Sequence, residues 1–597
     1  MRGIKKRGLV GAFVIVFNIS RFVFCSEVSF LDLEPIVVSK SADHSYSIDS
    51  DDIKDFLSSS LIEALTLTPL DLQSRSLKGG IQTDFSLRGS NFQGVLMLIN
   101  GQRVNDPQTG HHNSDIPFTT ADIEKIEVIP GVNSSIFGPD AIGGAINFRL
   151  KKPKDKERVV EFRVGQHQTT AELLSISEQQ DNLAVRFSLE NEESAGFRDD
   201  TDFNKFITSF NSILDSPFGE LGLNLGYQEK EFGAYDFYTP ASGYLSKEWT
   251  KTFLGSTGVI IERDGFSVKP NFLWRRHYDK FMLDKTGVRS KYINHHRTDV
   301  FTPGIYVQRQ TDIGKLGIGL EYGEERINSS NLGKQRRNHR SIFVDENLDI
   351  LSCLSLGASF RQDDYDGLDN MLTAAFTLRK NLSQKNSIHA GVARSFRLPT
   401  FTELYYSDPT TVGNAGLSAE KSLTYQAGYD YTHKNLSAGF TLFFREEKDF
   451  IDWIKRTASQ EKWQVENISD AEVFGTENYL KLRINENLNW ESNYSYIDKR
   501  MNSHGYLYKY GPNYIRHLVN NRLLYNCAFG NQAIGMTYKK KPGRDGWFLL
   551  DGCFSYRVNK NSRIFLSISN ILNVEYQEIA GIPQPGREVT AGVRFEW

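Results

Sequence analysis

One polar stretch of this chain groups side chains that could bind a ligand or a metal. It runs from Asp106 to Asn113 and reads Asp-Pro-Gln-Thr-Gly-His-His-Asn. Amide, hydroxyl and imidazole groups on such a flexible backbone suit a large polar ligand held by many modest hydrogen bonds. Two alternatives stay open for His111 and His112: imidazole is a usual axial ligand of haem iron, and loop histidines also bond to neighbouring backbone.

A second group of side chains is acidic. Asp199, Asp200 and Asp202 follow Arg198 closely along the chain. Clustered carboxylates match the oxygen preference of Ca²⁺, so they are candidate calcium ligands in an outer loop. The alternative is that these acids are solvated and that one of them pairs with Arg198.

A third group is aromatic. Tyr235, Phe237 and Tyr238 lie in a short stretch with glycine and proline, which is typical of a loop. These rings could stack on a planar macrocycle or on siderophore aromatics. They could equally belong to the aromatic girdle of a membrane barrel, and the sequence does not separate the two.

The sequence offers no sign of an enzyme. It contains no nucleophile elbow, no phosphate loop and no HExxH helix. Beyond the N-terminus, only Cys353, Cys527 and Cys553 remain, too far apart to suggest a disulfide framework or a metal site. The formal net charge of −3 gives no electrostatic argument for nucleic acid. We therefore expect neither catalysis nor a required cofactor.

The elements that position these groups are predicted to be β-strands. The 597 residues include 40 Phe and 26 Tyr, yet the mean hydropathy is only −0.42. No stretch after the N-terminus approaches eighteen apolar residues, which excludes a helical membrane protein there. This composition suits a transmembrane β-barrel, in which only alternate residues face lipid, although a large soluble β-protein remains open on composition alone.

Alternation with a period of two supports the barrel from Glu157 onward. In the last strand, Val589, Val593 and Phe595 point one way while Thr590 and Arg594 point the other. With strands of about 9–11 residues plus turns, this part of the chain could hold about 22 strands.

The N-terminus predicts export. Basic residues precede a mostly apolar run from Gly8 to Phe24, so residues 1–26 are predicted to be a signal peptide. A lipoprotein anchor at Cys25 is disfavoured, because the preceding Phe22-Val23-Phe24 lacks the small residues expected there.

Several ordered motifs between Ile81 and Leu150 resemble the plug of TonB-dependent outer-membrane receptors. Short apolar runs at Val95–Ile99, 126–129 and 145–150 alternate there with glycine-rich turns. The motifs are, in chain order, Leu87-Arg88-Gly89, Leu98-Ile99-Asn100-Gly101, Ile123-Glu124-Lys125-Ile126-Glu127-Val128, Phe137-Gly138 and Asp140-Ala141-Ile142-Gly143-Gly144-Ala145-Ile146-Asn147.

The resemblance implies a fold and a location. We expect an all-β transmembrane barrel of about 22 antiparallel strands, with an N-terminal α/β plug domain inside the lumen, in the bacterial outer membrane. Residues 27–50 would form a periplasmic arm, residues 51–154 the plug and residues 155–597 the barrel. Within the plug, helical spacing of apolar residues predicts one helix from Asp52 to Leu67.

The resemblance also implies a partner. An apolar, β-branched segment in the arm is similar to the TonB box, which adds as a strand to the periplasmic protein TonB, itself energised by an inner-membrane complex. The alternative is an ordinary first strand of the plug. The segment consists of Glu34, Pro35, Ile36, Val37, Val38 and Ser39.

By the same resemblance, two plug loops would face outward and bind the ligand, together with the aromatic barrel loop described above. The plug residues are Gly80, Ile81, Gln82, Gln108, Thr109, His111, His112 and Asn113.

The expected function is uptake of a scarce nutrient too large for porins. The layout is most similar to the cobalamin-receptor branch, so the ligand is predicted to be cobalamin or a related corrinoid, with a ferric siderophore as the alternative. Haem is disfavoured by the same resemblance. Haem receptors of this family typically carry a histidine in the barrel loop that corresponds to residues 397–414, and these residues contain none, although His295 and His296 could substitute. An ungated porin or adhesin is the alternative of a different class.

Overall fold

The computed structural model describes residues 46–597 except 154–155, 239–242, 469, 502–503 and 512. The predicted signal peptide and the segment Glu34–Ser39 lie outside the described residues. None of the described helices has the length and apolar character needed to cross a membrane.

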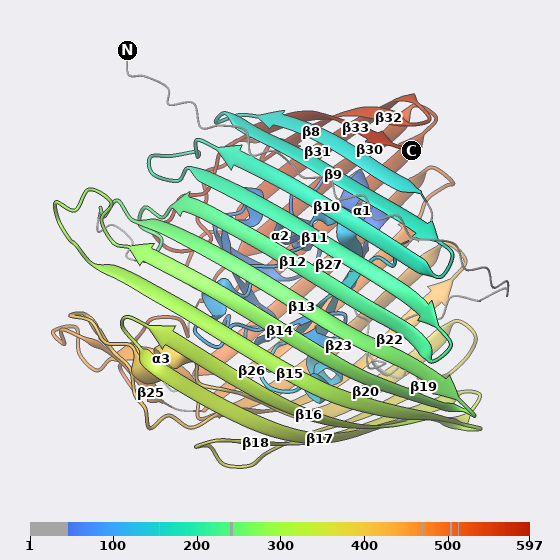
Figure 1. Ribbon diagram of the computed structural model, residues 1–597, viewed down its shortest axis with the longest axis horizontal. Helices are drawn as coiled ribbons and strands as arrows, with labels where there is room; N and C mark the ends of the chain where they lie inside the picture. Colours follow the sequence, from blue (N-terminus) through green and yellow to red (C-terminus); the bar gives the residue numbers. More distant parts are fainter. Residues whose placement is uncertain (1–45, 154–155, 239–242, 469, 502–503, 512) are drawn as a thin grey trace. The chain divides into compact units, whose positions relative to one another are not determined.

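Twenty-two antiparallel strands form one closed barrel, which confirms the predicted fold (Figure 1). The ring closes where β33 pairs with β8. The strands are β8 (Glu157–Gly165), β9 (Thr169–Gln180), β10 (Leu183–Ser194), β11 (Phe203–Ser216), β12 (Gly219–Gly233), β13 (Lys247–Arg263), β14 (Phe266–Met282), β15 (Ile293–Thr311), β16 (Gly314–Ser329), β17 (Gly333–Leu351), β18 (Leu354–Tyr365), β19 (Met371–Asn381), β20 (Asn386–Arg397), β22 (Glu420–His433), β23 (Leu436–Lys448), β26 (Ala471–Arg483), β27 (Leu488–Met501), β29 (His517–Cys527), β30 (Gly530–Lys540), β31 (Trp547–Asn559), β32 (Ser562–Ser569) and β33 (Glu588–Glu596).

The two ends of the barrel differ in their connections. At one end the turns are short, as between β9 and β10 or between β13 and β14. At the other end the connections are long, and that after β20 carries α3 (Phe401–Tyr405) and β21 (Thr411–Val412). Because outer-membrane barrels have short periplasmic turns and long outer loops, we call these the turn end and the outer end.

Part of the outer loops forms a small sheet of its own. Its strand order is β21-β25-β24-β28, with β24 (Ile451–Lys455), β25 (Trp463–Asn467) and β28 (Leu507–Tyr508).

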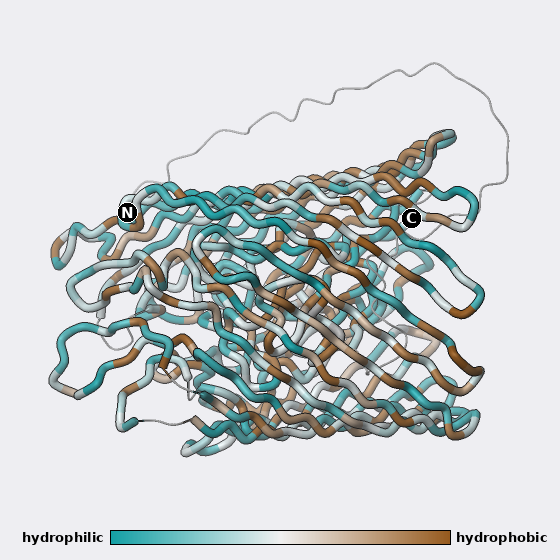
Figure 2. Tube along the Cα trace, turned by 90° about the horizontal axis from the view of Figure 1, so that it is seen from below, coloured by the Kyte–Doolittle hydropathy of each residue, from teal (hydrophilic) through white to brown (hydrophobic). Residues whose placement is uncertain are grey.

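The barrel strands alternate between apolar and polar side chains, as Figure 2 shows along the trace. On the paired strands β18 and β19, Phe360 and Phe376 are 45% and 48% exposed on the outside. Arg361 and Thr373, each next to an outward-facing position, are buried. Apolar rings facing lipid and polar groups facing the lumen are the arrangement that the sequence pattern predicts.

The plug has a mixed five-stranded sheet in the order β1-β6-β7-β4-β5, in which β4 and β7 run parallel. The predicted short apolar runs all become strands of this sheet. Its strands are β1 (Tyr46–Asp49), β4 (Val95–Ile99), β5 (Gln102–Arg103), β6 (Ile123–Pro130) and β7 (Gly144–Leu150), and a separate hairpin joins β2 (Asp71–Ser76) to β3 (Gln82–Ser86). Because β1 begins at Tyr46, this sheet starts earlier than the predicted boundary at residue 51.

The predicted single helix from Asp52 to Leu67 is wrong. The structure has α1 (Ser50–Asp55), then α2 (Leu61–Ala64) and the 3₁₀ helix η1 (Leu65–Leu67). Leu57 adopts a left-handed φ of 52°, which stops the first helix, and Ser60 caps the second by accepting from the Glu63 N–H. Local capping therefore overrides the apolar spacing that favoured one continuous helix. The other 3₁₀ helices of the plug are η2 (Lys78–Gly80), η3 (Gly110–His112), η4 (Thr120–Asp122) and η5 (Gly131–Phe137).

Hydrogen bonds around the whole ring place the plug inside the barrel. In Figure 1 the blue plug elements lie among the barrel strands. A group bonded to strands on all sides of a closed ring must occupy its lumen. The plug residues and their barrel partners include Asp122 with Ser188 and Ser209, Ile81 with Lys230, Asp106 with Arg275 and Thr298, Arg103 with Glu325, Arg88 with Gln426, Arg445 and Glu477, Gly89 with Lys499, Thr68 with Asn520, Asp55 with Asn531, and Lys78 with Thr590.

Candidate functional site

The candidate ligand site is the outer face of the plug. The loop from Asp106 to Asn113 contacts the outer end of the barrel, because the Phe401 N–H donates to the Pro107 carbonyl at 2.9 Å. The Thr402 N–H donates to the Gln108 carbonyl at 3.1 Å. Backbone hydrogen bonds to α3 thus hold this loop at the outer end, where the barrel connections are long.

Four rings meet at this loop, one of them from the loop itself. We call them the aromatic cluster: Phe92, His111, Tyr238 and Tyr510. His111 stacks on Phe92 with ring centroids 4.4 Å apart, and Tyr510 meets Phe92 edge-on at 5.1 Å. The Tyr238 ring lies 5.9 Å from His111. Residues from the plug and from two barrel loops therefore build one aromatic surface that could stack on a flat ligand.

His111 is oriented by a buried charge pair beneath it. Its Nδ1 lies 2.7 Å from Asp84 Oδ1, and Arg75 donates to the other carboxylate oxygen at 3.0 Å. Burial alone would raise the pKa of the Asp84 carboxyl, but Arg75 and His111 outweigh it and lower that pKa to about 2. Burial lowers the pKa of His111 itself, so the ring is neutral at neutral pH. Because Asp84 is ionised, Nδ1 carries the proton and Nε2 is left as an acceptor.

His112 points into a different environment. Its Nε2 lies 3.5 Å from Asp279 Oδ2 on the barrel wall. Burial would lower the pKa of His112, but the hydrogen bond to Asp279 and the surrounding carboxylates raise it to about 9. The pKa is thus lowered for His111 and raised for His112, although the two residues are adjacent in one loop.

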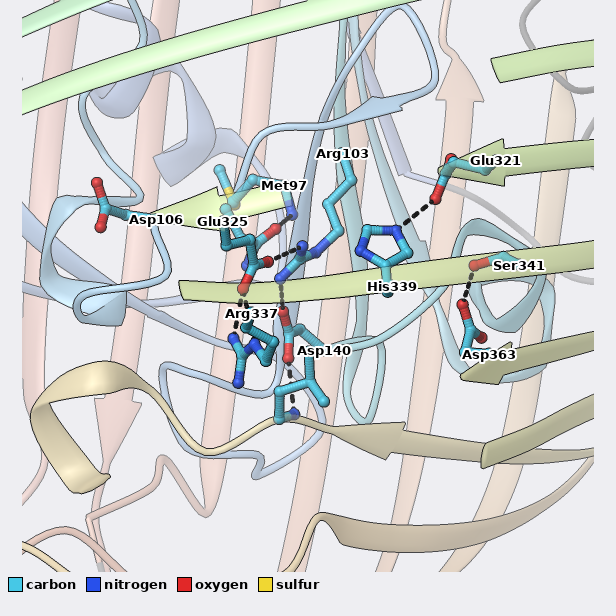
Figure 3. Close-up of polar contacts among 12 residues, drawn as sticks. Met97, Arg103, Asp106, Asp140, Glu321, Glu325, Arg337, His339, Ser341 and Asp363 are labelled. Atoms are coloured by element: carbon cyan, nitrogen blue, oxygen red, sulfur yellow. Dashed lines mark hydrogen bonds and ion pairs between the residues drawn. The ribbon is translucent and has the colours of Figure 1, made fainter. Parts of the chain in front are cut away.

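A set of ion pairs joins the same face of the plug to the barrel wall, and we call it the outer clamp (Figure 3). Arg103 of the plug donates to Glu325 at 2.9 Å and to Asp140 at 2.7 Å. Arg337 also donates to Glu325, at 2.9 Å through Nε. Asp140 in turn accepts from the Leu398 N–H at 3.2 Å. The outer clamp therefore couples the plug to the loop that carries α3.

A small cleft lies between the outer clamp and the loop from Asp106 to Asn113. Its lining is mostly polar and comes from both the plug and the barrel. The lining residues are Gln93, Arg103, Asn105, Asp106, Pro107, Gly110, Asn113, Asp140, Arg337, Leu398, Pro399 and Thr400.

Comparisons with known proteins decide the family. A family model described as TonB dependent receptor-like, beta-barrel matches residues 170–571, and one described as TonB-dependent Receptor Plug Domain matches residues 38–145. The chain belongs to the TonB-dependent receptors. The receptor is thus an outer-membrane protein, and its family transports large substrates across that membrane.

Individual relatives divide between two kinds of ligand. The receptor is 25% identical to the vitamin B12 transporter BtuB of Photobacterium profundum, over 67% of this chain and 66% of that protein. It is 23% identical to BtuB of Vibrio vulnificus, over 86% of this chain and 84% of that protein. Among solved structures, the siderophore receptor PirA of Pseudomonas aeruginosa superposes with a TM-score of 0.74 at 17% identity, covering 94% of this chain and all of that one.

The structure brings the two predicted plug loops of the receptor together through Tyr238. Gln82 donates to the Tyr238 hydroxyl at 2.6 Å, and that hydroxyl donates to Glu248 at 2.6 Å. Ile81, in contrast, packs in a buried group with Phe237. Gly80 has a left-handed φ of 63° and lies against Ile62, so it shapes the turn.

The remaining predicted residues are held by neighbours. Thr109 accepts from the His111 N–H, and the amide of Gln108 donates to Asp279 at 3.1 Å. Asn113 accepts from the Asp106 N–H at 2.9 Å. Tyr235 lies beneath the guanidinium of Arg198, 5.4 Å from its ring centroid.

The predicted calcium ligands of the receptor lie at the outer end, next to lysines. Asp200 forms an ion pair with Lys285, and Asp202 lies 3.8 Å from Lys247 Nζ. A calcium ion at Asp199, Asp200 and Asp202 stays a prediction, and both lysines would have to move aside to admit it.

Sequence reasoning missed the outer clamp and half of the aromatic cluster. Phe92 lies between two of the quoted motifs, and Tyr510 lies in an outer loop that none of the quoted motifs covers. Of the residues that were missed, only Asp140 could have been found from the sequence, because it begins one of the quoted family motifs.

Proposed function

We propose that the receptor imports a corrinoid, cobalamin or a close relative, in a TonB-dependent cycle. The observation that carries this proposal is the aromatic cluster, which lies beside an amide-rich loop. Two relatives of the receptor, the BtuB proteins of Photobacterium profundum and Vibrio vulnificus, are vitamin B12 transporters and point to the same ligand class.

The chemistry of a corrinoid suits this face of the plug. The ligand is a flat macrocycle whose rim carries amide groups, so rings such as His111 and Tyr510 match its faces. Neutral donors and acceptors in the cleft match its rim through many modest hydrogen bonds. The neutral state of His111 leaves Nε2 as an acceptor for such an amide.

A ferric siderophore is the second candidate, because the similar PirA structure is that of a siderophore receptor. Anionic iron chelates are bound best by cations that can form charge-assisted hydrogen bonds. Arg75 and Arg103 on the outer face of the plug are already paired with buried carboxylates. Their pairing favours a ligand without a large negative charge.

The coupling step of the proposed cycle starts at the turn end. Glu34–Ser39 would pair with TonB as an added strand and transmit a pull to the plug. In support, α1 follows Tyr46–Asp49 directly and contacts the turn end, where Lys54 lies 3.7 Å from Glu596 of the last barrel strand. A periplasmic partner would reach the chain from this side.

Ligand titration tests the proposed substrate. We expect the purified receptor to bind cyanocobalamin, and Tyr510→Ala to weaken binding about fivefold, since losing one stacked ring costs about 1 kcal/mol. Tyr322→Ala, on the outward face of β16, is the matched control. Tight binding of a ferric catecholate without binding of cobalamin would reverse the choice of ligand. Repeating the titration with and without Ca²⁺, and with Asp200→Asn, tests the calcium prediction.

Deletion of residues 34–39 tests the energy coupling. We expect ligand uptake by cells to be lost while ligand binding to the purified receptor is unchanged, because the deletion leaves every residue of the proposed ligand site in place. Unchanged uptake would instead indicate an ungated porin or adhesin.

A further inference from the structure

A buried group of histidines and carboxylates lies between the plug and the barrel wall. His112 and Asp115 come from the plug, and His277 comes from β14. One ligand atom from each of these three residues lies within 4.8 Å of the others. The same holds for a second set in which His112 is joined by Glu248 and Asp279.

Some polar atoms of this group have no hydrogen-bond partner among the described residues. They include Asp115 Oδ2 and His277 Nε2, and both side chains are almost fully buried, at 2% and 0% exposure. Asp115 Oδ2 faces the group, since it lies 3.7 Å from His277 Nδ1. Leaving such atoms unpaired is costly, so a bound species that satisfies them would stabilise the folded protein.

The charged groups around this site are paired with one another. Asp115 forms an ion pair with Lys230, and the neighbouring Asp106 pairs with Arg275. Asp279 lies 3.5 Å from His112, whose pKa it raises. An imidazole must be neutral to bind a metal, so a bound cation would take the place of the proton on His112.

The spacing and the donor types favour a transition metal. The rings of His112 and His277 lie side by side, with centroids 4.4 Å apart. Ligand atoms around a tetrahedral Zn²⁺ are about 3.3 Å from one another, since each bond is about 2.0–2.1 Å long. The separation of 3.7 Å between Asp115 Oδ2 and His277 Nδ1 is close to that value. An ion bound to this nitrogen would replace its contact with Thr252 Oγ1 at 2.9 Å. Two imidazoles and one carboxylate suit Zn²⁺, Co²⁺ or Ni²⁺ better than Ca²⁺ or Mg²⁺.

We propose that His112, Asp115 and His277 bind one divalent transition-metal ion. Two ligands belong to the plug and one to the wall, so the ion would fasten the loop from Asp106 to Asn113 to β14. This site is separate from the aromatic cluster, and its existence does not depend on which ligand the receptor transports.

Cobalt is the probe that tests this proposal. The full-length receptor, purified in detergent and stripped with a chelator, is titrated with CoCl₂ while the visible d–d absorption is recorded. We expect one equivalent of Co²⁺ to give the spectrum of a four-coordinate N/O site, and Zn²⁺ to displace it. His112→Gln and His277→Gln should each weaken binding at least about 100-fold. Mutation of a residue that only hydrogen-bonds to a metal ligand already lowers metal affinity by up to about 100-fold.

The control is His389→Gln, which alters another fully buried wall histidine, bonded to Asp430. It should bind Co²⁺ as the wild type does. Heat-dependent mobility on SDS gels reports whether each variant has folded, and a Zn²⁺-dependent rise in the Tm of the wild type gives a second readout. Binding that survives in folded His277→Gln but is lost in folded Asp279→Asn would overturn the assignment, as would a wild type that binds no Co²⁺.

Discussion

The two ends of the plug are attached to the barrel in different ways. At the outer end, Arg103 bridges Asp140 and Glu325 at 2.7 and 2.9 Å, and Glu325 is only 1% exposed. At the turn end, the ion pairs of α1 are longer and less buried, such as Arg522 to Asp52 at 3.8 Å and Lys54 to Glu596 at 3.7 Å.

This difference suits a plug that is pulled from the turn end. Exposed or long ion pairs contribute little, whereas removing one partner of a buried pair is costly. A force applied to the arm would therefore release α1 first and reach the outer clamp last. The following predictions test this order, from the largest expected effect to the smallest.

Arg103→Met should give the largest loss of stability. It leaves Asp140 and Glu325 buried without their shared cation, which costs about 3 kcal/mol. We expect faster hydrogen exchange throughout β4 and β5 and a lower Tm. Arg456→Met is the control, because Arg456 pairs with Glu466 at an exposed position of the outer loops. Equal exchange in the two variants would mean that burial of the Arg103 ion pairs adds nothing to the stability of the plug.

Mild acid should tighten the docking of α1. Burial raises the pKa of Asp52 to about 6, only partly offset by Arg522. A carboxyl whose pKa is raised on folding contributes stability at low pH that is lost as the pH rises through 6. We expect protection of residues 46–57 to increase between pH 7.5 and 5, by about 1–2 kcal/mol, after correction for intrinsic exchange rates.

Asp52→Asn should reduce this pH dependence and raise protection at pH 7.5, and Asp55, whose pKa burial also raises, accounts for the dependence that remains. Asp51→Asn, at an exposed position, should leave the dependence intact. Protection that falls in acid would contradict the sign worked out here.

Lys54→Ala should have the smallest effect. Its partner Asp51 is exposed and the distance to Glu596 is long, so the change should cost less than about 0.5 kcal/mol. Hydrogen exchange of α1 should rise no more than about twofold. A loss as large as that of Arg103→Met would mean that α1 is held as firmly as the outer face.

Much of the fold follows from local patterns. Alternation and turn signals predict β4, β6 and β7, and the barrel strands show the expected exposure of Phe360 and Phe376. The helix from Asp52 failed because Leu57 and Ser60 impose a break that apolar spacing does not reveal.

The site is harder to predict because its contacts are long-range. Arg103 and Glu325 are 222 residues apart in the chain and meet only through the register of the closed ring. Tyr510 reaches Phe92 in the same way, from an outer loop far along the chain. Residue types could therefore nominate His111 and His112 but could not show that the two rings point to opposite surroundings.

The closure between β8 and β33 has a consequence for biogenesis. The strand that seals the ring follows the other barrel strands in the chain, whereas the plug precedes them all. During export the cylinder can thus be completed around a domain that has already been synthesised, and a chain truncated before residue 588 would leave the seam open.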